Sequence, residues 1–215
     1  MHRMLFEKTG SAIWMSHLDL MRLMQRAFRR AGVQLHHSQG YTPHAYVSML
    51  LPLSVGVESH CEIMEYELDT EVKVTPEALN AVLPEGVRIL RSYDSNRKAK
   101  ELTLLHAEVI LEYDNGVPKD ALQKIAALLC AQTLVVEKRT KRGQEDVDIR
   151  PMLKRCELRS DEKTVILDCV VCAQNPSLNP MLLAAAIERY LPELRPSFSR
   201  CRRLEVLDSE GSIFR

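Results

Sequence analysis

The sequence predicts an α+β protein built from two tandem ferredoxin-like units, each with the order β-α-β-β-α-β. Two observations predict this class: short apolar, strand-like runs alternate with amphipathic helical stretches, and the same order of six elements occurs twice. We expect the first unit over residues 1–95 and the second over residues 100–215, with a basic insertion at 138–160. The polar residues 94–101 are expected to link them.

In the first unit, residues 3–8 are an apolar strand. Ser16 and Asp19 have the spacing of a capping box, and apolar side chains at helical spacing continue to a stop at Gly32. Further elements are expected as strands at 46–51, 61–69 and 88–92, with a helix opening at Thr75-Pro76-Glu77. Alternation along 61–69 predicts a strand with an acidic outer face.

In the second unit the same reasoning predicts strands at 104–113, 134–139, 164–172 and 201–207, and helices at 118–131 and 180–191. The segment 140–160 interrupts this order and is expected to be a charged hairpin or loop.

Composition limits the classes of function. Twenty-nine basic and 29 acidic residues give a net charge of zero, which excludes a globally basic nucleic-acid binder. No apolar run reaches the roughly 18–20 residues of a membrane span, and a charge comes too early for a secretory signal, so a cytoplasmic protein is expected. In that compartment the six scattered cysteines are interpreted as reduced thiols.

Basic residues nevertheless gather locally. Along the first helix, four arginines at i, i+4, i+7 and i+8 form a stripe opposite the apolar face: Arg22, Arg26, Arg29 and Arg30. Arginine suits phosphate because its planar fork donates two hydrogen bonds. The alternative is a solvated helix face, or pairing with the acidic strand. A second basic group contains Lys138, Arg139, Lys141, Arg142 and Arg150.

Six of the seven histidines fall in the first 60 residues, and residues 36–44 form a loop rich in hydrogen-bonding and aromatic groups. Tyr41 and His44 are the candidates in this loop for contact with an unpaired RNA base. The alternative is a solvated loop with structural contacts only. His17, in the first helical turn, and His44 are the candidate acid–base residues if the protein is a nuclease.

Other chemistry lacks a pattern. Cys169 and Cys172 form a single CxxC within a strand-like run, where residues three apart point to opposite faces and cannot readily share a metal. No histidine pair has the i, i+4 spacing of a helical zinc site, and no phosphate-binding glycine loop or CxxxCxxC cluster motif occurs. We therefore expect no metal and no cofactor, and favour a protein that is not itself an enzyme.

Several strings together resemble a known family. They are Phe6-Glu7-Lys8-Thr9-Gly10, Ser16-His17-Leu18-Asp19-Leu20, Arg26-Ala27-Phe28-Arg29-Arg30-Ala31-Gly32, Ser38-Gln39-Gly40-Tyr41-Thr42-Pro43-His44, Pro52-Leu53-Ser54-Val55-Gly56-Val57-Glu58-Ser59 and Asp148-Ile149-Arg150-Pro151. The chain resembles the radical-SAM-linked family, a bacterial domain of unknown function. Its members are encoded beside, or fused behind, a radical S-adenosylmethionine (radical-SAM) protein. The family pattern often has Phe where Tyr41 stands.

The resemblance implies partnership with a radical-SAM protein encoded nearby. Three hypotheses remain open: an accessory protein that binds RNA for modification of tRNA or rRNA by that partner, a metal-independent endoribonuclease, or an adaptor that docks the partner without RNA. The first two predict RNA binding that weakens steeply with salt, and only the second predicts cleavage.

Overall fold

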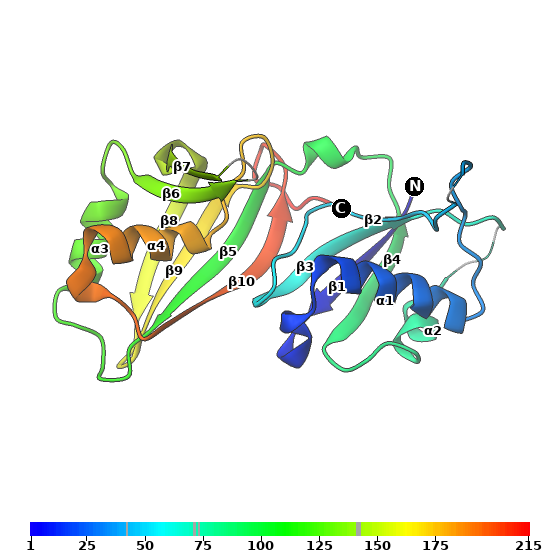
Figure 1. Ribbon diagram of the computed structural model, residues 1–215, viewed down its shortest axis with the longest axis horizontal. Coiled ribbons are helices and arrows are strands. Elements are labelled where there is room, and N and C mark those ends of the chain that lie inside the picture. Colours follow the sequence, from blue (N-terminus) through cyan, green and yellow to red (C-terminus); the bar gives the residue numbers. More distant parts are fainter. Residues whose placement is uncertain (42, 71, 73, 141–142) are drawn as a thin grey trace. The chain divides into compact units, whose positions relative to one another are not determined.

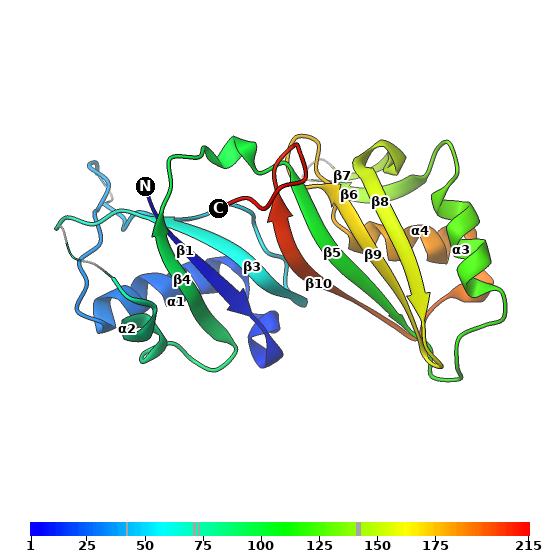
Figure 2. The same ribbon diagram turned by 180° about the vertical axis from the view of Figure 1, so that it is seen from behind.

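The computed structural model describes residues 1–215 except 42, 71, 73 and 141–142, and leaves the side chains of Arg139 and Thr140 undescribed. The chain divides into two compact units. Unit 1 contains Met1–Ala99 together with Arg215, and unit 2 contains Lys100–Phe214. Both combine an antiparallel sheet with a few helices (Figures 1 and 2), which confirms the mixed α+β class.

Unit 1 has four sheet strands: β1 (His2–Lys8), β2 (Val47–Met49), β3 (Val57–Tyr66) and β4 (Val87–Asp94). Their spatial order is β4-β1-β3-β2, and every neighbouring pair is antiparallel. The helices α1 (His17–Arg30) and α2 (Pro76–Asn80) cover one face of the sheet (Figure 1), and a 3-10 turn at Gly10–Trp14 leads into α1.

Helix α1 begins and ends where its sequence directs. Ser16 Oγ accepts a hydrogen bond from the backbone N–H of Asp19 at 3.2 Å, and Gly32 follows the helix with φ +74°, a conformation that glycine adopts without strain. The apolar face of the helix packs onto the sheet, where its buried residues are Leu20, Met24, Ala27 and Phe28. The opposite face is therefore left to the arginines.

The predicted acidic outer face of the third strand is wrong. Glu62 and Glu65 are 3% and 7% exposed, because both faces of β3 are covered. Each carboxylate has a polar partner: Ser59 Oγ donates to Glu62 at 2.6 Å, and the guanidinium of the buried Arg3 donates to Glu65 at 2.7 and 3.0 Å. Glu62 and Glu65 are three residues apart and therefore lie on opposite faces of β3, and alternation could not show that either carboxylate is buried.

Unit 2 has a main sheet of four strands: β5 (Leu104–Glu112), β8 (Leu153–Ser160), β9 (Thr164–Cys172) and β10 (Phe198–Leu207). Their order is β10-β5-β9-β8, again antiparallel throughout, so the strands of both units follow the order fourth-first-third-second. Helices α3 (Ala121–Leu129) and α4 (Met181–Tyr190) lie on one face of this sheet (Figure 2).

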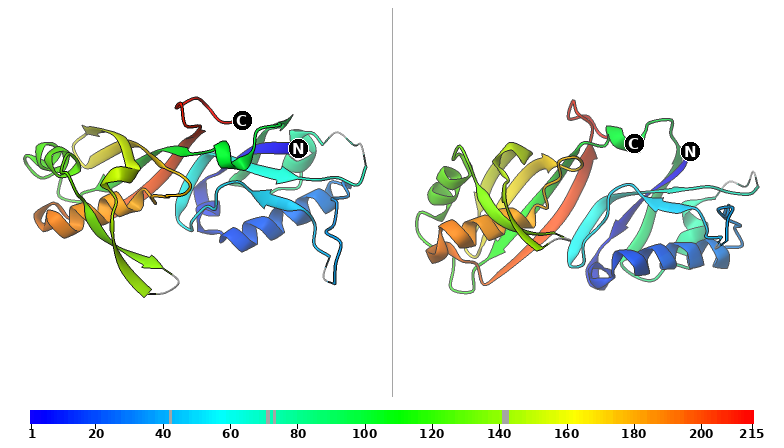
Figure 3. Two further views of the ribbon diagram at one scale, coloured as in Figure 1. Left: turned by 90° about the horizontal axis from the view of Figure 1, so that it is seen from above. Right: turned by 45° about the horizontal axis from the view of Figure 1, so that its top comes forward.

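One predicted element of unit 2 has a different role. The strand expected at 134–139 exists as β6 (Val135–Thr140), but it pairs only with β7 (Gly143–Asp148) in a separate two-stranded sheet. Figure 3 shows this hairpin standing away from the main sheet. The place beside β9 is taken by β8, which falls in the segment expected to be a charged hairpin or loop. The charged residues of β8 led to the prediction of a loop. They are compatible with a strand because β8 is at the edge of the sheet, where one face can remain open to solvent.

Two further observations concern composition. All six cysteines are free thiols, and four of them are buried: Cys61, Cys169, Cys172 and Cys201. Among the residues that the structure describes, no helix has both the length and the apolar character needed to cross a membrane.

Candidate functional site

A groove of about 750 Å³ lies in unit 1 beside the C-terminal half of α1. One wall is the outer face of the helix and the other is the segment 32–45 that connects it to β2. The described residues that line it are Arg22, Gln25, Arg26, Arg29, Gly32, Val33, Gln34, Leu35, His37, Pro43, His44 and Ala45. None of these is acidic, and the polar side chains among them are three arginines, two glutamines and two histidines.

The helix supplies the cationic wall because of its spacing. Arg22, Arg26 and Arg29 lie one turn apart on one face and are all exposed. Arg22 has a weak ion pair with Asp19 at 3.4 Å, with both side chains about two-thirds exposed. Among the described residues, no carboxylate lies within ion-pair distance of Arg26 or Arg29. The expected alternative, pairing with the acidic strand, is not what the structure shows for these side chains.

The opposite wall is held by backbone hydrogen bonds. His36 N–H donates to the carbonyl oxygen of Glu67 at 2.8 Å, Tyr46 N–H donates to that of His36 at 2.8 Å, and Ser38 N–H donates to that of His44 at 3.0 Å. An ion pair between His36 Nδ1 and Asp69 at 2.7 Å adds a second anchor. The segment is thus a narrow, tied loop with its ends fixed to the sheet.

Two histidines of this loop line the groove. His37 Nδ1 lies 2.9 Å from the carbonyl oxygen of Leu35, and His44 Nδ1 lies 3.2 Å from Ser38 Oγ. The amide of Gln25 joins the two walls by donating to the carbonyl oxygen of Ala45 at 3.3 Å. These contacts orient the rings and hold the arginine-bearing helix against the loop.

The structure brings together four of the predicted residues of unit 1: Arg22, Arg26, Arg29 and His44. Arg30 is exposed on the same helix but does not line the groove, and the ring of Tyr41 is fully exposed outside it. His17 does not line it either. Its Nδ1 is buried without a hydrogen-bond partner among the described residues, at the other end of α1.

The second predicted basic group lies in unit 2. Lys138, on β6, is partly exposed, and its Nζ donates to the carbonyl oxygen of Ser177 at 3.4 Å. Arg150 follows β7, and its guanidinium donates to the carbonyl oxygen of Leu153 at 3.0 Å. Lys141 and Arg142 lie outside the described residues, as does the side chain of Arg139.

Three polar residues of the groove were not among the predicted site residues: Gln25, Gln34 and His37. A signal for Gln25 existed, because it lies three residues after Arg22 and four before Arg29, within the same stripe. No signal identified Gln34, whose place depends on the path of the loop. Among the described residues, no group of three or more His, Cys, Asp or Glu side chains is arranged to hold a metal ion.

Fold and site together define an α+β protein of two units with an arginine groove in which none of the described lining residues is acidic. The chain belongs to a bacterial protein family described as "Uncharacterized protein conserved in bacteria (DUF2344)", whose model matches residues 2–180. No curated protein matches the chain in sequence.

Two solved structures are similar in fold. A chain in the crystal structure of a Cbf5–Nop10–Gar1 complex has a TM-score of 0.53 and 11% identity, covering 95% of this chain and 48% of that chain. A chain in the archaeal box H/ACA sRNP Nop10–Cbf5 complex has a TM-score of 0.47 and 12% identity, covering 94% and 46%. The protein therefore spans about half the length of these chains, and the likeness to the first shows a shared fold.

Proposed function

We propose that this protein is an accessory RNA-binding protein that acts with a radical-SAM enzyme in the modification of tRNA or rRNA. The observation that carries the RNA part is the groove of unit 1. Its three arginines face a loop with two histidines, and no described lining residue is acidic. Arg26 and Arg29 present exposed guanidinium groups about one turn apart, with no carboxylate partner among the described residues, and this arrangement suits the phosphates of a nucleic acid chain.

The arrangement favours a single-stranded or looped RNA. Arg26 and Arg29 would bind successive phosphates, while His44 and the exposed ring of Tyr41 offer stacking surfaces for unpaired bases. In unit 2, Lys138, Arg139, Lys141, Arg142 and Arg150 would extend the contact to the backbone. The strand order of each unit supports assigning both as ferredoxin-like units, with boundaries near residues 95 and 100.

The radical-SAM partner rests on the sequence resemblance, most of all on the strings around Ser16 to Leu20 and Ser38 to His44. The proposed division of labour is that the partner performs the radical chemistry and this chain holds the RNA. Co-expression with the radical-SAM protein encoded nearby, followed by size-exclusion chromatography, should give one complex. Separate elution at micromolar concentration, with and without RNA, would argue against the partnership.

The RNA proposal is tested by fluorescence anisotropy with labelled bulk tRNA across a salt series. The double substitution Arg26→Gln, Arg29→Gln should weaken binding roughly ten- to a hundredfold, because two charge-assisted contacts are lost. It should also flatten the slope of log K against log salt by about 1.4 to 1.8, since each phosphate contact contributes about 0.7 to 0.9.

The matched control is Arg88→Gln, Arg91→Gln, which removes the same charge from exposed positions of β4 outside the groove. Both double variants should unfold within about 0.5 kcal/mol of the parent, as exposed substitutions usually do. Equal weakening by the two variants would mean that only net charge matters and would remove the groove from the RNA site. A protein without salt-dependent RNA binding would instead support the adaptor hypothesis.

A second candidate function is the metal-independent endoribonuclease, with an observation of its own: His37 and His44 both line the arginine groove. Paired histidines beside a phosphate-binding arginine suit general acid–base cleavage of RNA. Of the two predicted candidates, His44 lines the groove and His17 does not, so His17 is not favoured. Cleavage of the labelled RNA that is lost in His37→Gln and in His44→Gln would establish this candidate over the accessory role.

A further inference from the structure

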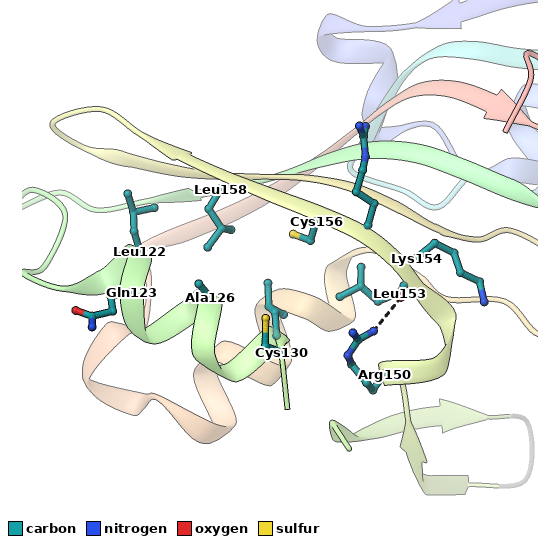
Figure 4. Close-up of a pocket in the computed structure, with 11 residues that line it drawn as sticks. Leu122, Gln123, Ala126, Cys130, Arg150, Leu153, Lys154, Cys156 and Leu158 are labelled. Carbon is teal, nitrogen blue, oxygen red and sulfur yellow. Dashed lines mark hydrogen bonds between the residues drawn. The ribbon is translucent and has the colours of Figure 1, made fainter. Parts of the chain in front are cut away.

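A second cavity, of about 430 Å³, lies within unit 2 between α3 and the edge strand β8. Figure 4 shows Leu122, Ala126 and Cys130 extending from the helix side towards Leu153, Cys156 and Leu158 of the strand. Its walls are mainly aliphatic side chains and two thiols. The volume falls within the range of small-molecule binding sites, roughly 300–1,000 Å³.

The periodicities of the two elements explain why the cavity is apolar. On α3, Ala121, Ile125 and Leu129 are buried in the core. The neighbouring stripe, one residue further on, is Leu122, Ala126 and Cys130, which lines the cavity. Because Ala126 is small, the stripe leaves space in front of the strand.

On strand β8, Cys156 and Leu158 supply the apolar wall of the cavity. Arg155 also lines the cavity, but its charge is paired with Glu157 at 3.4 Å and with Asp168 at 3.6 Å. Burial raises the pKa of Cys156 to about 11, with smaller contributions from Asp168, Cys130 and Glu157, so the thiol stays neutral beside its apolar neighbours.

The end of the cavity near the start of β8 is cationic. Asp148 Oδ1 accepts hydrogen bonds from the backbone N–H groups of Leu134, at 2.8 Å, and Arg150, at 3.0 Å, which fixes the turn that carries Arg150. The guanidinium of Arg150 donates one hydrogen bond, to the carbonyl oxygen of Leu153, and Lys154 Nζ donates to that of Pro151 at 3.0 Å. Among the described residues, neither cation has a carboxylate within ion-pair distance.

We propose that the α3–β8 cavity binds a small amphiphilic anion, with its apolar body between α3 and β8 and its anionic head group at Arg150 and Lys154. The aliphatic walls select the body by the hydrophobic effect, and the cationic end selects the sign of the head group. Among the described residues, four of the five guanidinium N–H donors of Arg150 have no partner. The cavity is separate from the arginine groove of unit 1, and Arg150 is the one described residue that it shares with the basic group proposed to contact RNA.

The first experiment uses 8-anilinonaphthalene-1-sulfonate, a fluorescent probe with an apolar body and one negative charge, on the intact protein. Saturable binding is expected. Ala126→Trp fills the cavity and should weaken it at least tenfold. Ala127→Trp is the matched control, because Ala127 is exposed on the same helix and does not line the cavity. Equal affinities of these two variants, each shown to be folded by circular dichroism, would overturn the proposal.

The second experiment tests the head group. Decanoate and decylamine, both below their micellar concentrations, compete with the probe, and decanoate should compete at least tenfold better. The double substitution Arg150→Gln, Lys154→Gln should remove this preference, whereas the exposed control pair Lys119→Gln, Lys163→Gln should keep it. Equal competition by both amphiphiles in the parent protein would show a purely apolar surface and reject an anion site.

Cys130 provides an independent readout, because it is exposed and lines the cavity. Bound decanoate should slow its alkylation by iodoacetamide several-fold, in proportion to occupancy, with the modified residue identified by peptide mass mapping. An unchanged alkylation rate of Cys130 at saturating decanoate would mean that decanoate binds elsewhere and would contradict the assignment.

Discussion

Each unit has a hollow beside its first helix, and the two hollows differ in chemistry. In each unit the first helix lies next to the edge strand of its sheet, α1 beside β2 and α3 beside β8. Beside α1 the walls carry three arginines and two histidines, whereas the stripe of α3 that faces β8 carries Leu122, Ala126 and Cys130, and the cations of that cavity come from Arg150, Lys154 and Arg155. Both units thus have a hollow beside the first helix, and the side chains next to the buried stripe of that helix decide what each hollow can bind.

The connection between helix and edge strand differs as well. In unit 1 it is a loop tied by backbone hydrogen bonds between its own ends and to the sheet. In unit 2 it contains the β6–β7 hairpin and the turn that carries Arg150. The first connection forms a wall of the groove, and the second supplies the cationic end of the cavity.

The two units differ in how deeply an ion pair of the sheet is buried, and we expect this difference to produce the greatest change in the free energy of unfolding. In unit 1 the ion pair between Arg3 and Glu65 is buried, with side chains 0% and 9% exposed. Arg3→Gln leaves a buried carboxylate without its charge partner and should lower the free energy of unfolding by about 3–5 kcal/mol in urea denaturation.

The comparable pair of unit 2, Arg200 and Glu112, has side chains 41% and 37% exposed. Arg200→Gln should therefore cost at most about 1 kcal/mol. Losses of similar size in the two variants would break this contrast. The double variant Arg3→Met, Glu65→Leu should recover most of the lost stability, because it leaves no unpaired charge.

The next prediction concerns the reactivity of Cys156, which tests whether the wall of the α3–β8 cavity is apolar. With a pKa of about 11, Cys156 is only about 0.1% thiolate at pH 8, against roughly a quarter for an ordinary cysteine with a pKa near 8.5. Its alkylation by iodoacetamide should be roughly two hundredfold slower than that of free cysteine at pH 8. Between pH 8 and 10 the rate should rise about tenfold per unit.

The same shift affects stability in a defined direction. The folded protein holds the Cys156 proton more tightly than the unfolded chain does. The contribution of this thiol to the free energy of unfolding is therefore fully present below about pH 8.5 and is lost as the pH rises towards 11. If Cys156 is alkylated at pH 8 nearly as fast as free cysteine, the cavity wall around it is exposed to water, and the prediction of an apolar wall is wrong.

The last comparison concerns two glycines with nearly the same φ, +86° at Gly86 and +87° at Gly116. A Cβ at Gly86 would lie 2.5 Å from the carbonyl oxygen of Thr9 and 2.8 Å from Ala12 Cβ, whereas at Gly116 the nearest atom is 3.4 Å away. Gly86→Ala should cost about 2–4 kcal/mol and Gly116→Ala about 1–2 kcal/mol, since only the first adds a clash to the backbone strain. Equal losses in thermal denaturation would mean that the 3-10 turn moves aside freely.

Much of the fold could be predicted because its signals are local. The capping box of α1, the stop at Gly32 and the proline-led start of α2 depend on side chains within a few residues of each other. The strand at 153–160 could not be predicted. Its charged side chains obscure the strand pattern, and its place in the sheet depends on pairing with the distant strand β9. For the same reason β6 could be recognised as a strand but not placed in its hairpin.

The candidate site divides in the same way. Helical spacing alone placed Arg22, Arg26 and Arg29 on one exposed face. It could not place His37 and Gln34 opposite them, nor exclude His17, because those positions depend on how the loop is tied to Glu67 and Asp69. The α3–β8 cavity could not be predicted from the sequence. Leu122, Ala126 and Leu158 have the pattern of ordinary core residues, and only the folded structure shows that they line a cavity.

The α+β class, the amphipathic face of α1 and the burial of its apolar side follow from the order of residues alone, because periodicity and capping are properties of consecutive residues. The burial of Glu62 and Glu65, the place of β8 rather than β6 in the second sheet, and the side chains that meet across each hollow follow only from the folded arrangement. Those outcomes depend on the pairing of distant segments, and the free energy of each pairing is a property of both partners together.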